Sequence, residues 1–316
     1  MGNRIDPTRT LTLRNQFTRA VRKRFNTFAA DLRKWIRTAD PSMASMGYET
    51  VYLAANAPLT PAQVAANLEK AKGSIKKAKS YAAKHLPDPA VATWPKSFIE
   101  SSYKKGLARG NAELRKAAKG AGLAVPEATQ STRGNFGYDF LLPVEQADLD
   151  EMLARTYAHL NNVTEEMSAK LTGILSNGYM NGLHPYEIAK AVGLQVGMSK
   201  RRAEMIARTE MIRAHHRGNY RQYEKAGIEG VQFIVEWRAT AGSRTCKQCA
   251  SLDGQTFVLE DMRDAIPVHP NCRCCMIPVI DPSGKKGTPT MGETEIAKAK
   301  KAVGMPVNDP ATGVAK

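Results

Sequence analysis

Apolar residues recur at steps of three and four along several long segments of this chain, a spacing that places them on one face of an α-helix. The first segment follows Asp6-Pro7, a pair suited to the N-cap and the first helical position. Its apolar positions are Leu13, Phe17, Val21, Phe25, Phe28, Leu32 and Ile36. The pattern predicts a long amphipathic N-terminal helix, with basic residues around the rest of its circumference.

Two further helices are predicted before residue 120. One opens at Thr60-Pro61, is rich in lysine, and carries apolar residues at Val64, Leu68, Ala71, Ile75 and Ala78. The other runs from about Lys96 to Lys119. Gly106 and Gly110 lie four residues apart in this helix, which would permit close contact with another helix.

From Gly120 to about Asp139 the composition shifts to Gly, Ala, Thr, Ser and Pro, which indicates a linker. The helical pattern then resumes, with apolar positions at Leu149, Met152, Leu153, Leu160, Val163, Met167, Leu171 and Ile174. It predicts a long helix that ends at Asn177-Gly178 or Asn181-Gly182. A short helix from Pro185 to about Gly193 follows, and Ser199 is expected to cap a separate helix containing Ile206-Ala207-Arg208-Thr209-Glu210.

The pattern changes to strands after Gly230. Gln232 to Arg238, Gln255 to Leu259 after an Asp-Gly turn, and Met276 to Ile280 have the composition of strands. Pro278 suggests an edge position for the last of them. The residues after Asp281 predict a mobile tail with at most one helix, around Glu293 to Val303.

These elements predict a mainly α fold with a small C-terminal α+β cysteine-rich domain of zinc-knuckle-like type, and long amphipathic helices at the N-terminus. The predicted domains are a basic helical part (1–120), a linker (121–140), a second domain (141–280) that holds a Cys/His cluster at 237–280, and a mobile tail (281–316).

The positive charge of the chain suggests a polyanionic partner. The 316 residues include 46 Lys and Arg against 30 Asp and Glu, a net charge of +16. Such a field attracts nucleic acid, and double-stranded DNA would be bound without sequence preference. The candidate contacts lie on the first two helices: Arg19, Arg22, Lys23, Arg24, Lys76 and Lys77. A solvated helix surface is the simpler interpretation of such basic runs.

No apolar run is long enough for a membrane helix, and the N-terminus has no apolar signal core, so we expect synthesis in a cytoplasm and no membrane partner. In that reducing compartment, clustered cysteines are more often metal ligands than disulfides. All five cysteines fall between residues 246 and 275.

Their spacing suggests a zinc site. Cys246 and Cys249 form a C-x-x-C pair, and His269 with Cys272 supplies a second pair of the same spacing. Cys274 is an alternative ligand to His269, whereas Cys275 would alternate away from Cys274 into the core. A closed Cys3His site would be structural. Reduced cysteines in a small β domain without an ion remain the alternative.

Catalytic signatures are missing from this cluster. The zinc deaminase pattern lacks its H-x-E, no H-E-x-x-H is present, and His269 is the last histidine of the chain. The adjacent His215 and His216 lie beside charged residues on a predicted helix, where a buried polar network is the favoured interpretation. We therefore predict no enzymatic activity and no small-molecule substrate.

The combination of motifs resembles a known family. It comprises Trp237, Thr245-Cys246 with Cys249, Leu252-Asp253-Gly254-Gln255 and His269-Pro270-Asn271-Cys272-Arg273-Cys274. This run, with Ile206 to Glu210 and Arg213-Ala214 before it, is similar to the C-terminal domain of the phage Mu F-like minor head proteins, also called phage head morphogenesis proteins. The likeness covers about residues 150 to 280.

The resemblance implies a minor capsid protein of a tailed phage or prophage, located in the virion inside the capsid and made in the host cytoplasm. It implies association with the portal protein and other head proteins during procapsid assembly, with a role in accompanying the genome during DNA ejection. The alternative hypotheses are a zinc-containing nucleic-acid-binding protein acting mainly on DNA, and a metal-dependent nuclease.

Overall fold

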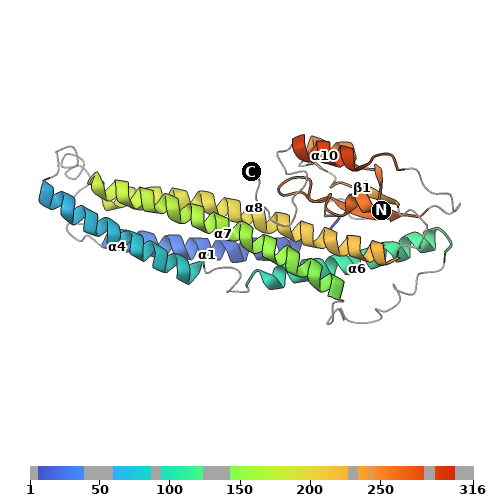
Figure 1. The fold of residues 1–316 in the computed structure, drawn as a ribbon, viewed down its shortest axis with the longest axis horizontal. Helices are drawn as coiled ribbons and strands as arrows, with labels where there is room; N and C mark the ends of the chain where they lie inside the picture. Colours follow the sequence, from blue (N-terminus) through green and yellow to red (C-terminus); the bar gives the residue numbers. More distant parts are fainter. Residues whose placement is uncertain are drawn as a thin grey trace. The chain divides into compact units, whose positions relative to one another are not determined.

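The protein is mainly helical and contains a small three-stranded antiparallel sheet near its C-terminus (Figure 1). The computed structural model describes residues 6–38, 60–86, 94–123, 143–226, 234–240, 242–243, 245–280 and 289–302. Its long helices are α1 (Leu11–Thr38), α4 (Pro61–His85), α6 (Lys96–Gly120), α7 (Pro143–Met180) and α8 (Pro185–Ala226). The C-terminal elements are β1 (Ile234–Arg238), α9 (Lys247–Leu252), β2 (Thr256–Val258), η2 (Glu260–Met262), β3 (Cys275–Val279) and α10 (Glu293–Ala302). The mainly α prediction is confirmed, and the zinc-knuckle-like part of it stays a prediction.

Local sequence signals explain several of the helix ends. Thr60 and Gln63 form a capping box at the start of α4, with Pro61 in the first helical position, as the sequence predicts. Helix α7 continues past Asn177-Gly178 and ends at Met180, and Gly182 takes a positive φ of 65° in the turn that follows. The second of the two predicted ends is therefore the correct one.

The prediction of two helices between Pro185 and Ala226 is wrong, because α8 is one continuous helix of 42 residues. Ser199 does not begin a helix. Its buried hydroxyl instead accepts a hydrogen bond from the side chain of Gln195 at 3.3 Å. Val192 and Val196 are buried on either side of Gly193, and this packing outweighs the weak helix propensity of glycine.

The chain forms two compact units. The first, unit 1, comprises Met1–Phe17, Trp94–Thr156 and Met205–Lys316, and unit 2 comprises Thr18–Thr93 and Tyr157–Glu204. Helices α1, α7 and α8 each contribute one part to each unit. Of the predicted linker, residues 124–140 lie outside the described residues, as do 281–288 and 303–316 of the predicted tail.

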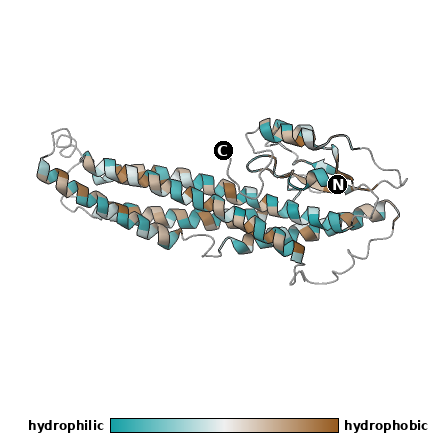
Figure 2. Cartoon of the chain, viewed as in Figure 1, coloured by the Kyte–Doolittle hydropathy of each residue, from teal (hydrophilic) through white to brown (hydrophobic). Residues whose placement is uncertain are grey.

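Unit 2 consists of parts of four helices packed by their apolar faces. Figure 2 shows hydrophobic and hydrophilic positions interleaved along each long helix, as expected for amphipathic helices. The core residues are Val21, Phe25, Phe28, Leu32 and Ile36 from α1, Ala71, Ala78 and Ala82 from α4, Leu160, Val163, Met167, Leu171 and Leu175 from α7, and Ile188, Ala189, Val192 and Val196 from α8. Polar contacts also join these helices: Arg22 forms an ion pair with Glu204 at 3.0 Å, and His85 Nε2 is hydrogen-bonded to Asp31 Oδ2 at 2.8 Å.

Unit 1 contains the sheet, whose strand order is β2-β1-β3. The central strand β1 pairs Val235 with Phe257 on one side and with Pro278 on the other, so Pro278 lies on an edge strand as predicted. Trp237 of β1 and Phe257 of β2 are fully buried and share one core with Cys249, Cys272 and Cys274. We call residues 234–280, with the exception of positions 241 and 244, the cysteine domain.

Helix α10 lies against the cysteine domain. Its Ile296 and Ala299 join the same core, and Lys300 Nζ donates to the Asp264 carbonyl oxygen at 2.7 Å. A helix around Glu293 to Val303 is the one element that the sequence predicts after residue 281, and α10 matches it. Residues far beyond the cysteines therefore help to cover the domain.

Helices α6 and α8 cross at very short distance within unit 1. A Cβ atom added at Gly106 would lie 2.1 Å from the His215 carbonyl oxygen, and one at Gly218 would lie 2.3 Å from the Tyr103 carbonyl oxygen. At Gly110 it would lie 2.8 Å from Gln222 Cβ. The close contact predicted at Gly106 and Gly110 is confirmed, and Gly218 is its counterpart on α8.

Candidate metal centre

The first pair of cysteines is held by the start of helix α9. Cys246 is the N-cap residue, and its sulfur accepts the backbone N–H of Cys249 at 3.3 Å. Positions three apart in a helical turn face the same side, so both thiols point into one space.

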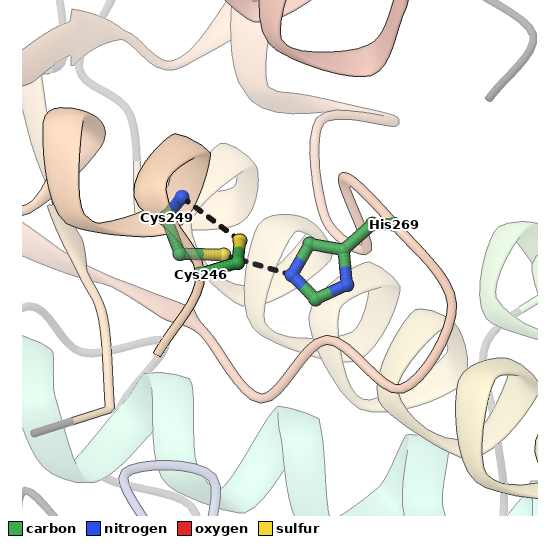
Figure 3. A group of neighbouring side chains, drawn as sticks. All are labelled: Cys246, Cys249 and His269. Atoms are coloured by element: carbon green, nitrogen blue, oxygen red, sulfur yellow. Dashed lines mark hydrogen bonds between the residues drawn. The ribbon is translucent and has the colours of Figure 1, made fainter. Parts of the chain in front are cut away.

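His269 approaches the same space from the opposite side (Figure 3). Its Nδ1 donates to the Pro270 carbonyl oxygen at 2.7 Å, and its Nε2 lies 3.0 Å from Cys249 Sγ. Because the carbonyl can only accept, the proton of the neutral ring sits on Nδ1 and Nε2 carries a lone pair. Metal-binding histidines commonly have this arrangement, with the second nitrogen fixed by a carbonyl.

The five candidate ligands form two groups that share one residue. The donor atoms of Cys246, Cys249 and His269 lie within 4.8 Å of one another, and so do those of Cys249, Cys272 and Cys274. Cys246 and Cys272 belong to different groups. The structure thus brings together three of the four predicted ligands, Cys246, Cys249 and His269, and places the fourth, Cys272, in the second group with Cys249 and Cys274.

A small pocket opens among these side chains. Its volume of about 20 Å³ suits a single ion or water molecule. The residues that line it are Thr240, Thr245, Cys246, Cys249, His269, Asn271, Arg273 and Cys274. Four possible ligands therefore face the pocket, namely Cys246, Cys249, His269 and Cys274, whereas Cys272 does not line it. Cys274, which was predicted as an alternative to His269, thus lines the pocket together with it.

The buried thiols share hydrogen bonds. Those from the Cys249 and Cys274 thiols hold the pKa of Cys272 well below its ordinary value. The pKa of Cys249 is raised in return, first because of its hydrogen bond with Cys272. Burial raises the pKa of Cys275 to about 12, and this residue lies outside both groups. Cys275 thus packs in the interior, as its alternation with Cys274 predicts.

Helix α8 holds the turn that carries His269 and Cys272. Arg208 Nε donates to Asn271 Oδ1 at 2.7 Å, and Thr209 Oγ1 accepts the Asn271 backbone N–H at 3.0 Å. Asn271 has a positive φ of 59°, a conformation that asparagine tolerates better than most residues. Its positioning role was missed in the sequence, although an asparagine within a tight His-Pro-Asn-Cys turn is a signal for this conformation.

His216 and Arg217 of α8 belong to a polar network that joins this helix to the cysteine domain. His216 Nε2 lies 2.6 Å from the Met262 carbonyl oxygen, and Arg217 donates to Asp264 at 2.9 Å. Burial lowers the pKa of His215 to about 3 and that of His216 to about 4, so both rings are neutral near pH 7. Neither histidine lines the pocket beside the cysteines, which agrees with the polar network favoured from the sequence.

The residues proposed for nucleic-acid contact all lie in unit 2, away from the cysteines in the sequence. Arg19, Lys23 and Lys76 are exposed, Arg24 and Lys77 are half-buried, and Arg22 is bound to Glu204. The described part of unit 2 contains 18 Lys and Arg against 6 Asp and Glu, a net charge of +12. None of the helices in the described ranges is both long and apolar enough to cross a membrane.

Comparison with known proteins agrees with the sequence resemblance. Residues 169–277 match the family described as Phage Mu protein F like protein, which confirms the resemblance over 109 of the 316 residues. The chain is also similar to a protein of Enterococcus faecalis (strain ATCC 700802 / V583) named NAD(+)--arginine ADP-ribosyltransferase EFV. The two are 26% identical over 140 residues, which cover 40% of this chain and 29% of that protein. No solved structure matches.

Proposed function

We propose that this chain, which carries a Phage Mu protein F like region over residues 169–277, is a minor head protein that acts in phage head assembly. The observation that carries the proposal is that the matched region holds a helix and a cysteine domain that contact each other. It includes all of α8 and most of the cysteine domain, and the contacts of Arg208 and Thr209 with Asn271 join these two parts. The matched region therefore includes two parts that pack together and all the candidate metal ligands, and is more than an isolated motif.

The proposal also covers where the protein is located and which proteins it contacts. We propose that the protein is made in the host cytoplasm and is built into the virion inside the capsid. There it associates with the portal protein and other head proteins, and it accompanies the DNA during ejection. The basic helices before residue 169 lie outside the matched region and are available for these contacts.

We propose a structural role for zinc at the cysteine cluster. The donor set of three sulfurs and one imidazole suits tetrahedral zinc. The ligands would be Cys246, Cys249 and His269, with Cys272 or Cys274 as the fourth. When bound, the ion would link the start of α9 to the turn that α8 holds, and so fix a sheet of only three short strands.

The first test of the function is the composition of assembled particles. Heads purified after expression of the complete set of head genes are expected to contain this chain in low copy number, detectable by mass spectrometry. A matched preparation without its gene is expected to yield fewer mature, DNA-filled heads. Particles that lack the chain, together with normal heads from the deletion, would show that the protein has another role.

A second function, binding DNA as the main role, is favoured by the net charge of +12 on the described part of unit 2. Binding of the purified protein to double-stranded DNA is then expected to be micromolar or tighter near physiological salt and to weaken steadily as salt rises. Lys23→Glu with Lys76→Glu should weaken it more than a double reversal at Lys298 and Lys301. Loss of all binding at physiological salt would leave head assembly as the main role.

We propose no catalytic activity for the chain. The family in question consists of head morphogenesis proteins, and the transferase activity in the relative's name is a statement about that longer protein. A metal-dependent nuclease remains the least supported alternative, since no histidine follows His269.

A further inference from the structure

Helix α8 exposes a stripe of apolar residues within unit 2. Tyr186, Leu194 and Met198 are 50%, 65% and 50% exposed. Their spacing of eight and four residues places them on one side of the helix, over about 18 Å of its length. Lys190 and Arg201 are exposed on the same side. We call these five residues, together with Gly197, the α8 stripe.

Gly197 is a second feature of this exposed face of α8, independent of the apolar side chains. A Cβ atom added there would meet nothing within 4 Å among the described residues. Glycine inside a helix is destabilising relative to alanine, and without a side chain it leaves room for another backbone to approach. At Gly106 and Gly218 the same chain uses glycine where two helices cross at very short distance. Gly197 differs from them in having no described helix across from it, so the space beside it is open to a partner.

The charge of the surroundings restricts what could cover the stripe. The described part of unit 2 has a net charge of +12, so a second copy of the same face would be repelled. DNA would use Lys190 and Arg201 but would gain little from the three apolar side chains. An amphipathic helix with an apolar face and acidic flanks satisfies both the apolar and the basic positions.

We propose that the α8 stripe is the docking site for an acidic amphipathic α-helix of another head protein. The partner's apolar face packs on Leu194 and Met198, its backbone approaches at Gly197, and its carboxylates meet Lys190 and Arg201. Tyr186 anchors one end, where the Arg37 guanidinium lies 5.4 Å from the centre of its ring. The identity of the partner as a head protein rests on the proposed function, whereas the docking surface rests on the structure alone.

The test uses the full chain and the purified portal protein, followed by each other head protein, with affinity measured by titration calorimetry. Leu194→Asp is expected to weaken binding at least about tenfold, because a carboxylate replaces an apolar contact beside acidic partner residues. Leu68→Asp is the matched control, since Leu68 is an exposed leucine of α4, 42% accessible, in the same unit but outside the stripe. It should change affinity by less than about threefold.

Gly197→Ala separates docking from folding. The variant is expected to melt at a slightly higher temperature than the wild type, because alanine favours the helix and its Cβ has space. It should nevertheless bind the partner several-fold more weakly. A variant that is more stable and binds normally would show that no backbone approaches at this position and would overturn the proposed geometry.

The outcomes also distinguish the two proposals. If the wild type binds no head protein and is absent from particles, the proposed function is wrong. If the wild type binds a head protein and Leu194→Asp binds it equally well, only the docking site is wrong. Loss of self-association or of binding to phosphatidylglycerol vesicles in Leu194→Asp, with partner binding unchanged, would assign the stripe to a second copy or to a lipid surface and would overturn the proposal.

Discussion

Cys249→Ser is expected to abolish stoichiometric zinc binding and to unfold most of the cysteine domain at temperatures where the wild type is folded. Cys249 is the residue shared by both groups of donor atoms, and its Sγ lies 3.0 Å from His269 Nε2. A structural zinc supplies about 10 kcal/mol of folding free energy, and the loss of a central ligand forfeits most of it. Zinc content by elemental analysis and thermal unfolding by circular dichroism measure the two effects.

Cys275→Ala is the control for this change. Cys275 is buried beside the others but belongs to neither group of donor atoms. Its replacement removes one buried sulfur and should cost about 1 kcal/mol, with zinc content unchanged. If the wild type itself holds no zinc and Cys249→Ser melts together with Cys275→Ala, the cluster is not a metal centre, and the cysteines are core residues.

The same measurement identifies the fourth ligand. The spacing of the pairs in the sequence selects Cys272, whereas the pocket is lined by Cys274. Serine at whichever of Cys272 and Cys274 is the fourth ligand should reduce the zinc content as strongly as Cys249→Ser. Serine at the other position should lower the free energy of unfolding only by the contribution of one buried thiol. Both variants therefore need to be compared under the same zinc concentration.

The sequence predicts the long helices well because each carries an apolar face of the correct period. Phe17, Val21, Phe25, Phe28 and Leu32 of α1 are all buried. It fails where a local signal competes with packing. Ser199 and Gly193 suggest a break in α8, but the helix buries its side chains on both sides of these positions and continues.

The candidate site was predictable in part. Pairs of ligands are visible as spacings, because each pair lies within one turn of the chain. The sharing of Cys249 between two groups depends on how two turns meet in space, which no spacing reveals. The roles of Arg208 and Thr209 are equally hidden, since they contact Asn271 across more than sixty residues of sequence.

The largest effect outside the metal centre is expected from Gly106→Ala. The new Cβ would lie 2.1 Å from the His215 carbonyl oxygen, a backbone atom that cannot turn away, so α6 and α8 must separate. Separation weakens the bond from Ser102 Oγ to the Met211 carbonyl oxygen, now 2.7 Å long. We expect a loss of about 3 kcal/mol or more in the free energy of unfolding, measured by denaturant titration.

Gly173→Ala is the matched substitution for comparison. Gly173 also lies inside a long helix, α7, but a Cβ there meets nothing within 4 Å among the described residues. Alanine at this position should stabilise the protein by about 1 kcal/mol, because it favours the helix without a clash. If Gly173→Ala raises the free energy of unfolding and Gly106→Ala lowers it, the loss at Gly106 is due to the helix crossing. A gain in stability at Gly106 as well would mean that α6 and α8 do not approach as closely as the structure places them.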